Sequence, residues 1–402
     1  MILRYIGKRI WRLKIQALIL IALTLIFSLL LLYLNESLGV QRQKREEAMV
    51  NIPVRCIVTD QRGEQTERLY ISGLVYNNCV REDGHLYPYI DKIFLRASFA
   101  FNLQSLKQNQ QSLANLNLPA GGRSIVSLTR LEGERNLETV YGAEVHFLPG
   151  YSEEFFRDTS RYYCLLPWSI YELVQEGLIS AELLLNGYGE PVTMECEFEI
   201  IGYYLGGGGD IYCNWQVAQD IFASSLEPDY ADSLSFILKD NHKLEEFKAV
   251  ANQYFVRTGS EPSAITLHSL VIQDQQLNAT IFSLDRNIRL MQILLPLLNL
   301  MAVGIGFFVG YIYIRNRKQE FAVMASLGTG KKRVFSLVFL EQALLGLTGI
   351  ALGLLAYWLR QQEFALQHLG ISFGLFTCFT GGAAIAILRV LSLPVMAMLT
   401  TE

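Results

Sequence analysis

The sequence is poor in charge. Only 18% of its 402 residues are Asp, Glu, Lys or Arg, whereas soluble domains carry about 25%. Hydrophobic residues make up 51%, and this imbalance indicates a protein that places much of its surface in a membrane. The formal net charge is −4, so the basic surplus typical of nucleic-acid binding is missing, and we expect no nucleic-acid partner.

Cysteine and histidine are also scarce. The six cysteines include no Cys-x-x-Cys pair, although one disulfide among them remains an open alternative. No two of the five histidines have the spacing of metal ligands. Two apparent catalytic motifs are out of context. The Gly-x-Ser-x-Gly pattern at 370–374 opens an apolar helix, and residues 328–331 lack the full phosphate-loop spacing. We therefore expect no enzyme active site, metal or cofactor in this chain.

Four apolar runs are long enough to cross a bilayer, which takes about 20 helical residues. They are residues 15–34, 290–314, 334–359 and 371–390. A helix satisfies its own backbone polar groups, so these runs predict four transmembrane helices. A cleaved signal peptide is the alternative for the first run, but no small-residue cleavage site follows it, which favours an uncleaved anchor.

Basic residues give the predicted orientation. Lys and Arg are concentrated in residues 1–14 and 315–333, whereas the loop at 360–370 holds only one basic residue. Because short cytoplasmic flanks carry the positive excess, both termini, including residues 391–402, are predicted to be cytoplasmic. Residues 35–289 then lie outside the membrane.

This large insertion is predicted to be an α+β domain. Residues 192–200 alternate apolar and acidic side chains, as a half-buried strand does, and residues 243–255 follow the pattern of an amphipathic helix. The predicted fold class is therefore an α-helical membrane protein with four transmembrane helices and a large extracytoplasmic α+β domain inserted between helices 1 and 2.

An apolar seam leads into the second span. It consists of Leu277, Ile281, Leu284 and Ile288, at the spacing of a packed helix pair. The seam predicts a helical stalk over residues 266–289, with residues 35–50 as its partner helix. A short amphipathic helix on the domain surface is the alternative.

Polar and small residues stand out within the spans. Glu341, beside Gln342, is costly inside an apolar helix, so it either reaches the interface or pairs with a neighbouring helix, or it makes a packing or gating contact. Small residues spaced for close helix packing favour a bundle or a dimer. They are Gly306, Gly310, Gly349 and Gly353.

The C-terminal residues 315–399 carry a family resemblance. Residues 315–328 read Arg-Asn-Arg-Lys-Gln-Glu-Phe-Ala-Val-Met-Ala-Ser-Leu-Gly, and a basic group at 331–333 precedes the helix that contains Glu341. Residues 394–399 look like a closing Pro-Val-x-Ala-Leu element with Met398 inserted. Together with one span, a large insertion and three further spans, this sequence resembles the FtsX/MacB-like ABC transporter permeases.

The resemblance implies a non-catalytic permease subunit that works with a separate cytoplasmic ABC ATPase, which would bind the ATP and magnesium. It implies a coupling helix within residues 319–327 that docks on this ATPase; an interfacial helix that contacts only the lipid bilayer is the alternative. It also implies a second permease copy or a paralogue, as a homodimer or heterodimer. The coupling residues would be Glu320, Phe321, Val323, Met324, Leu327 and Gly328.

The function implied is transmission of ATP-driven motion through the helices and stalk to the extracytoplasmic domain. It would serve export or extraction of an unidentified substrate in a bacterial plasma membrane. The alternative is an FtsX-like signalling subunit that regulates an extracellular cell-wall hydrolase, whereas export favours an extracytoplasmic adaptor. A membrane-anchored receptor or adhesion protein without an ATPase is a weaker alternative.

Overall fold

The computed structural model divides into two compact units. The helical unit contains residues 1–48 and 280–402, and the sheet unit contains residues 49–279. The structure describes residues 14–108, 111–113, 124–134, 144–174, 176–186, 191–206, 209–224, 228–256, 267–317, 320, 324, 329–362 and 366–391.

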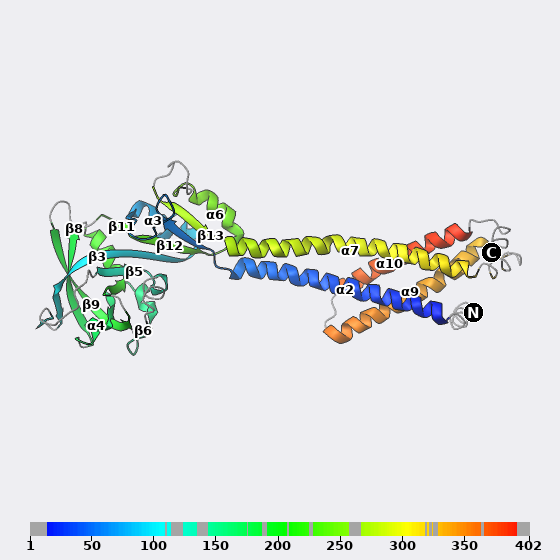
Figure 1. The fold of residues 1–402 in the computed structure, drawn as a ribbon, viewed down its shortest axis with the longest axis horizontal. Helices are drawn as coiled ribbons and strands as arrows, with labels where there is room; N and C mark the ends of the chain where they lie inside the picture. The colour runs from blue at the N-terminus through cyan, green and yellow to red at the C-terminus, as the bar shows by residue number, and fades with distance from the viewer. Residues whose placement is uncertain are drawn as a thin grey trace. The chain divides into compact units, whose positions relative to one another are not determined.

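Four long helices make up the described part of the helical unit (Figure 1). All four are long and apolar enough to cross a membrane, which confirms the four apolar helices expected from the sequence. Apolar side chains on most faces suit a helix that is surrounded by lipid and by other helices. The helices are α2 (Lys14–Asn51), α7 (Gln275–Arg315), α9 (Lys331–Gln361) and α10 (Leu366–Leu391).

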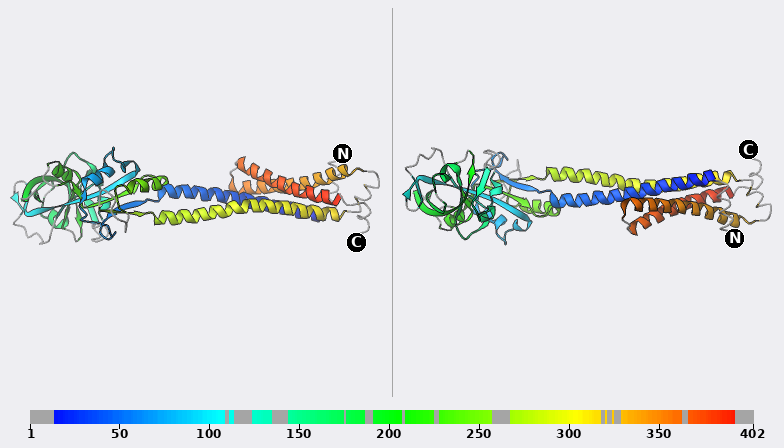
Figure 2. Two further views of the ribbon diagram at one scale, coloured as in Figure 1. Left: turned by 90° about the horizontal axis from the view of Figure 1, so that it is seen from above. Right: turned by 90° about the horizontal axis from the view of Figure 1, so that it is seen from below.

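Two of these helices continue beyond their apolar runs. α2 ends at Asn51, although its apolar run ends at Leu34, and α7 begins well before Leu290. Figures 1 and 2 show α2 and α7 side by side, and Arg45 Nε lies 2.9 Å from Asp285 Oδ1 between them. The two extensions therefore form a helix pair outside the apolar segments.

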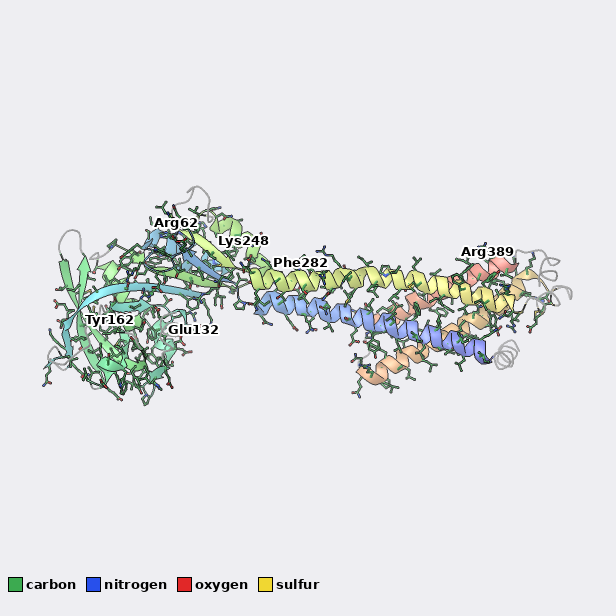
Figure 3. The ribbon with its side chains drawn as sticks, in the orientation of Figure 1. Arg62, Glu132, Tyr162, Lys248, Phe282 and Arg389 are labelled. Atoms are coloured by element: carbon green, nitrogen blue, oxygen red, sulfur yellow. The ribbon has the colours of Figure 1, made fainter. Side chains whose placement is uncertain are left out.

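The seam of α7 is its less exposed face. Leu277 and Ile288 are buried and Ile281 and Leu284 are half-buried, whereas Phe282 is 70% exposed and projects from the helix in Figure 3. This pattern agrees with the heptad-like spacing read from the sequence.

The predicted stalk needs one correction at its start. Residues 269–273 form a strand, β13, which pairs antiparallel with residues 55–59 of β1. The sheet satisfies the backbone groups of this segment, so the helix begins only at Gln275.

An eleven-stranded sheet dominates the sheet unit, with the order β13-β1-β12-β3-β5-β10-β7-β9-β6 and with β4 and β8 paired off this path. A separate two-stranded sheet joins β2 to β11. The strands are β1 (Arg55–Thr59), β2 (Ile71–Ser72), β3 (Ile90–Gln108), β4 (Gln111–Ser112), β5 (Ser124–Leu128), β6 (Glu144–Phe147), β7 (Tyr163–Pro167), β8 (Leu178–Asn186), β9 (Pro191–Leu205), β10 (Ile211–Asn214), β11 (Tyr230–Ala231), β12 (Ser233–Leu238) and β13 (Ser269–Gln273). The helices are α3 (Gly73–Val80), α4 (Trp168–Tyr171), α5 (Gln216–Ala223) and α6 (Leu244–Ala251), with the short helices η1 (Tyr87–Tyr89), η2 (Leu131–Gly133), η4 (Glu153–Arg157) and η5 (Asn241–Lys243).

The strand β3 connects distant parts of the sheet. Its first half pairs with β12, and further along it pairs with β5, β8 and β4. A single nineteen-residue strand thus pairs with β12 near its start and with β8 and β4 near its end.

The strand β9 alternates as its sequence predicts. Cys196, Phe198 and Ile200 are buried, whereas Glu195 and Glu197 are exposed. β8 pairs with β9 over Pro191–Glu199, whereas β6 and β7 pair with β9 from Glu199 onward. Among the described residues, Glu195 and Glu197 therefore lie on a stretch of β9 that has β8 as its one partner strand.

All six cysteines lie among the described residues and are free thiols. The five in the sheet unit are buried, and burial raises the pKa of Cys196 to about 11. A buried thiol of this kind acts as a small hydrophobe.

Candidate functional site

A charged cluster lies inside the helical unit, at the C-terminal end of α7. Glu341 on α9 is fully buried, and the side chain of Arg317 is 3% exposed. Arg317 Nη1 lies 3.1 Å from Glu341 Oε2, and Tyr313 Oη donates a hydrogen bond to Glu341 Oε1. Arg317 also donates to Tyr313 Oη and stacks 4.9 Å from its ring centre. The carboxylate therefore has the charge partner and the hydrogen bonds that a buried acid requires.

The same guanidinium contacts Glu320, one of the predicted coupling residues. Arg317 Nε lies 3.3 Å from Glu320 Oε2, and the Glu320 side chain is 55% exposed. Arg317 thus forms ion pairs with one acid inside the bundle and one acid at its surface. The Arg317 side chain therefore links Glu320 directly to Glu341.

Only part of the predicted coupling helix lies within the described residues. Met324 packs against an apolar cluster that includes Ile314 and Val338, so its side chain faces the bundle. Phe321, Val323, Leu327 and Gly328 lie outside the described residues, as do residues 394–399.

A second polar side chain is buried beside the charged cluster. Gln342 is 1% exposed, and neither of its amide atoms has a hydrogen-bond partner among the described residues. A Cβ on Gly310 would lie 3.1 Å from Gln342 Oε1. An unsatisfied buried amide costs about 1–3 kcal/mol.

The four glycines noted in the sequence lie at helix contacts within the chain. A Cβ on Gly349 would overlap Thr24 Oγ1, and one on Gly353 would lie 2.8 Å from Ser28 Cβ, so α9 approaches α2 closely. A Cβ on Gly306 would overlap the Phe379 carbonyl, and Gly310 faces Ala383, so α7 approaches α10. These glycines pack the chain's own bundle.

Another polar cluster joins three helices at the other end of α9. Glu36 on α2 accepts hydrogen bonds from Tyr357 Oη at 3.1 Å and from Gln361 Nε2 at 2.6 Å. Tyr357 Oη also lies 3.3 Å from His368 Nε2 on α10. Since Glu341 and Tyr357 are both on α9, a rise of 1.5 Å per residue puts the two clusters about 24 Å apart along it. This separation is close to the thickness of a bilayer core, about 30 Å.

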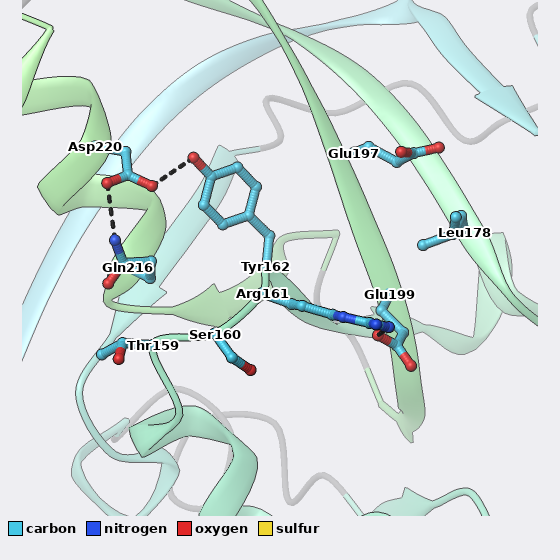
Figure 4. Close-up of a pocket in the computed structure, with 9 residues that line it drawn as sticks. All are labelled: Thr159, Ser160, Arg161, Tyr162, Leu178, Glu197, Glu199, Gln216 and Asp220. Carbon is cyan, nitrogen blue, oxygen red and sulfur yellow. Dashed lines mark hydrogen bonds and ion pairs between the residues drawn. The ribbon is translucent and has the colours of Figure 1, made fainter.

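The sheet unit contains a polar cavity of about 580 Å³ (Figure 4). Tyr162 Oη donates to Asp220 Oδ2 at 2.6 Å, and Arg161 Nη1 lies 3.1 Å from Glu199 Oε2. Burial, and then the bond to Asp220, raise the pKa of Tyr162. A hydrogen bond from Tyr151 lowers the pKa of Glu199. Three lining residues are acidic, yet among the described residues no group of His, Cys, Asp or Glu could hold a metal ion.

Sequence reasoning missed Arg317 and Tyr313. Tyr313 lies at the end of the second apolar run and Arg317 just after it, where Arg317 served as a charge that sets orientation and as part of the family motif, with no partner assigned to it. A signal was present, because Tyr313 and Arg317 are four residues apart and so share one helix face with each other.

Residues 293–401 match the family model described as FtsX-like permease C-terminal. This segment is similar to the C-terminal domain of FtsX-like permeases. The matched segment contains all three residues of the buried cluster, together with Glu320 and the four glycines.

Two solved structures are similar to the chain at low identity. One is the periplasmic region of MacB from Actinobacillus actinomycetemcomitans, with 11% identity, a TM-score of 0.31, and coverage of 59% of this chain and 95% of that chain. The other is the extracellular domain of the noncanonic ABC-type transporter YknZ from Gram-positive bacteria, with 9% identity, a TM-score of 0.30, and coverage of 54% and 99%. TM-scores this low do not establish a common fold. No curated protein matches the chain.

Proposed function

We propose that this chain is the permease subunit of an ABC transporter, which carries motion from a separate cytoplasmic ATPase to the sheet unit for export or extraction of a substrate. The match of residues 293–401 to the FtsX-like permease C-terminal family carries the proposal. ATP and magnesium would bind to the ATPase.

The ion pairs of Arg317 support a route for this motion. The ATPase would dock on residues 319–327, where Glu320 contacts the Arg317 guanidinium. Arg317 then contacts Glu341 of α9, which lies against α2 through Gly349 and Gly353. A push on the cytoplasmic segment would thus reach α2 and α7, the two helices that continue outward as a pair.

The proposed orientation places residues 315–333 in the cytoplasm and the sheet unit outside, in a bacterial plasma membrane. The charge of the flanks supports it, because Lys and Arg dominate residues 315–333. Four spans give half of a symmetric transporter, so a second copy or a paralogue would complete it.

Labelling with a membrane-impermeant maleimide tests the orientation. Two variants supply the thiols to be labelled. Arg62→Cys replaces an exposed residue of the sheet unit, and Lys332→Cys replaces an exposed residue near the start of α9. Cys378→Ser provides the background, since the other five thiols are buried. In intact cells we expect only Arg62→Cys to react. Reaction of Lys332→Cys before lysis would overturn the orientation.

Affinity purification of the full chain from solubilised host membranes tests the partner. We expect ATPase activity to co-purify with the wild type and to be lost with Phe321→Asp or Leu327→Asp. Leu366→Asp is the matched control, because Leu366 is 87% exposed on α10 and lies outside the coupling segment. Absence of ATPase from the wild-type sample, or equal recovery with all variants, contradicts the proposal.

A further inference from the structure

A second cavity in the sheet unit is lined mainly by aromatic and small polar side chains. Its volume is about 460 Å³, within the range of small-molecule sites. The rings of Tyr70 and Tyr230 lie 5.4 Å apart and are tilted to each other by 46°, and Phe99 lies 6.1 Å from Tyr230. Tyr70 is 65% exposed, so part of its surface is open to a ligand.

The cavity has one charged lining residue, and it is acidic. Asp229 accepts a hydrogen bond from Tyr76 Oη, and Asn77 Nδ2 lies 3.4 Å from its other oxygen. A Cβ on Gly73 would overlap this carboxylate, so the glycine leaves room for it. Burial raises the pKa of Asp229, and a bound cation would oppose that shift by stabilising the charged form.

The backbone that presents Tyr70 is held in an unfavourable conformation. Tyr70 has φ +50° and Arg68 has φ +56°, a left-handed region that costs residues other than glycine about 1–2 kcal/mol each. Backbone hydrogen bonds fix the segment on both sides, from Leu69 N to Asp232 O and from Gly73 N to Asp229 O, each 2.9 Å long. Such strain is typical of functional positions.

We propose that this cavity binds a small organic cation of the amine or quaternary ammonium class, which would lie against the Tyr70 and Tyr230 rings on one side and face the Asp229 carboxylate on the other. Aromatic faces attract a cation within about 6 Å, and more strongly where water is displaced. The carboxylate supplies the counter-charge, and no lining residue carries a positive charge to oppose it. This site is independent of the proposed ATPase coupling, because binding needs only the sheet unit of the full chain.

Isothermal titration of the purified full chain tests the charge requirement. The chain is kept in maltoside micelles, because phosphocholine detergents carry the probe's own head group. The probe is choline, and the control is 3,3-dimethylbutan-1-ol, which has the same shape without the charge. We expect choline to bind at least about tenfold more tightly, from one desolvated cation–π contact and from the attraction between its charge and the Asp229 carboxylate. Equal affinities, or no binding of choline up to its solubility limit, would overturn the proposal.

A second titration separates two sources of such a cation. Glycerophosphocholine carries the head group of a lipid, whereas choline is a free solute. Tighter binding of glycerophosphocholine supports a lipid source, and tighter binding of choline supports a free cation.

Variants assign the binding to these residues. Tyr70→Gly removes the ring and also relieves the backbone, so we expect choline affinity to fall about five- to tenfold while the melting temperature stays equal or rises. Arg68→Gly gives the same backbone relief outside the cavity lining and should not weaken binding. Asp229→Asn should weaken choline binding without weakening that of the neutral control. Unchanged choline affinity in Tyr70→Gly and Asp229→Asn would contradict the assignment.

Discussion

Removing Arg317 should destabilise the helical unit more than removing Glu341. At 3.1 Å and an effective dielectric constant of about 20, the two charges attract each other by about 5 kcal/mol before desolvation is counted. Arg317→Met leaves the fully buried Glu341 carboxylate without a counter-ion, at a cost of about 3–5 kcal/mol. Glu341→Met leaves Arg317 with Glu320, so its cost should be smaller.

The double variant gives the decisive comparison. With both charges replaced by methionine, no buried charge is left without its counter-ion, and the exposed Glu320 is solvated, so the double variant should be more stable than Arg317→Met alone. Equilibrium unfolding in mixed micelles, followed by circular dichroism, measures all three free energies. Arg333→Met, at an exposed basic position of α9, is the control and should change stability little. If the double variant loses the sum of the two single losses, the pair is not coupled and the reasoning is wrong.

Three further outcomes are expected. Gly349→Ala should destabilise the same unit by about 1–3 kcal/mol because its Cβ overlaps Thr24, whereas Gly304→Ala, with open space around its Cβ, should not; the same unfolding assay decides. Glu36→Ala should broaden the distribution of distances between spin labels at Lys44→Cys and Leu366→Cys in double electron–electron resonance. Glu47→Ala should leave it unchanged, because Glu47 accepts a hydrogen bond from Gln43 of its own helix. Because the folded-state pKa of Glu199 is lowered, its charged form adds stability above its unfolded pKa of about 4.3, and this is lost as the pH falls through the folded value; the difference in melting temperature between wild type and Glu199→Gln should shrink there.

The sequence predicted the features that depend on local pattern. The four apolar helices follow from run length, and the alternating burial of β9 follows from its period of two. The seam through Leu277 and Ile288 follows from its spacing. In each case the residues that decide the outcome are neighbours along the chain.

The sites could not be predicted in the same way, because they join distant residues. The cost of Glu341 was visible in the sequence, but its partner Arg317 is 24 positions away along the chain. The carboxylate of Asp229 meets Tyr76 across 153 positions, and the left-handed backbone of Tyr70 leaves no mark in composition. The pairing of β2 with β11 and the adjoining backbone hydrogen bonds bring these groups together.

The length of β3 determines how the sheet unit comes apart. β3 pairs with β12 and also with β5 and β8 along one continuous backbone. The two parts of the sheet are therefore joined by a strand, not by a loop at which they could separate. Heat or mechanical tension should therefore melt residues 49–279 in one cooperative step. A circular permutant opened within β3 should fail to regain its structure, whereas one opened in the turn at residues 61–63 should recover it.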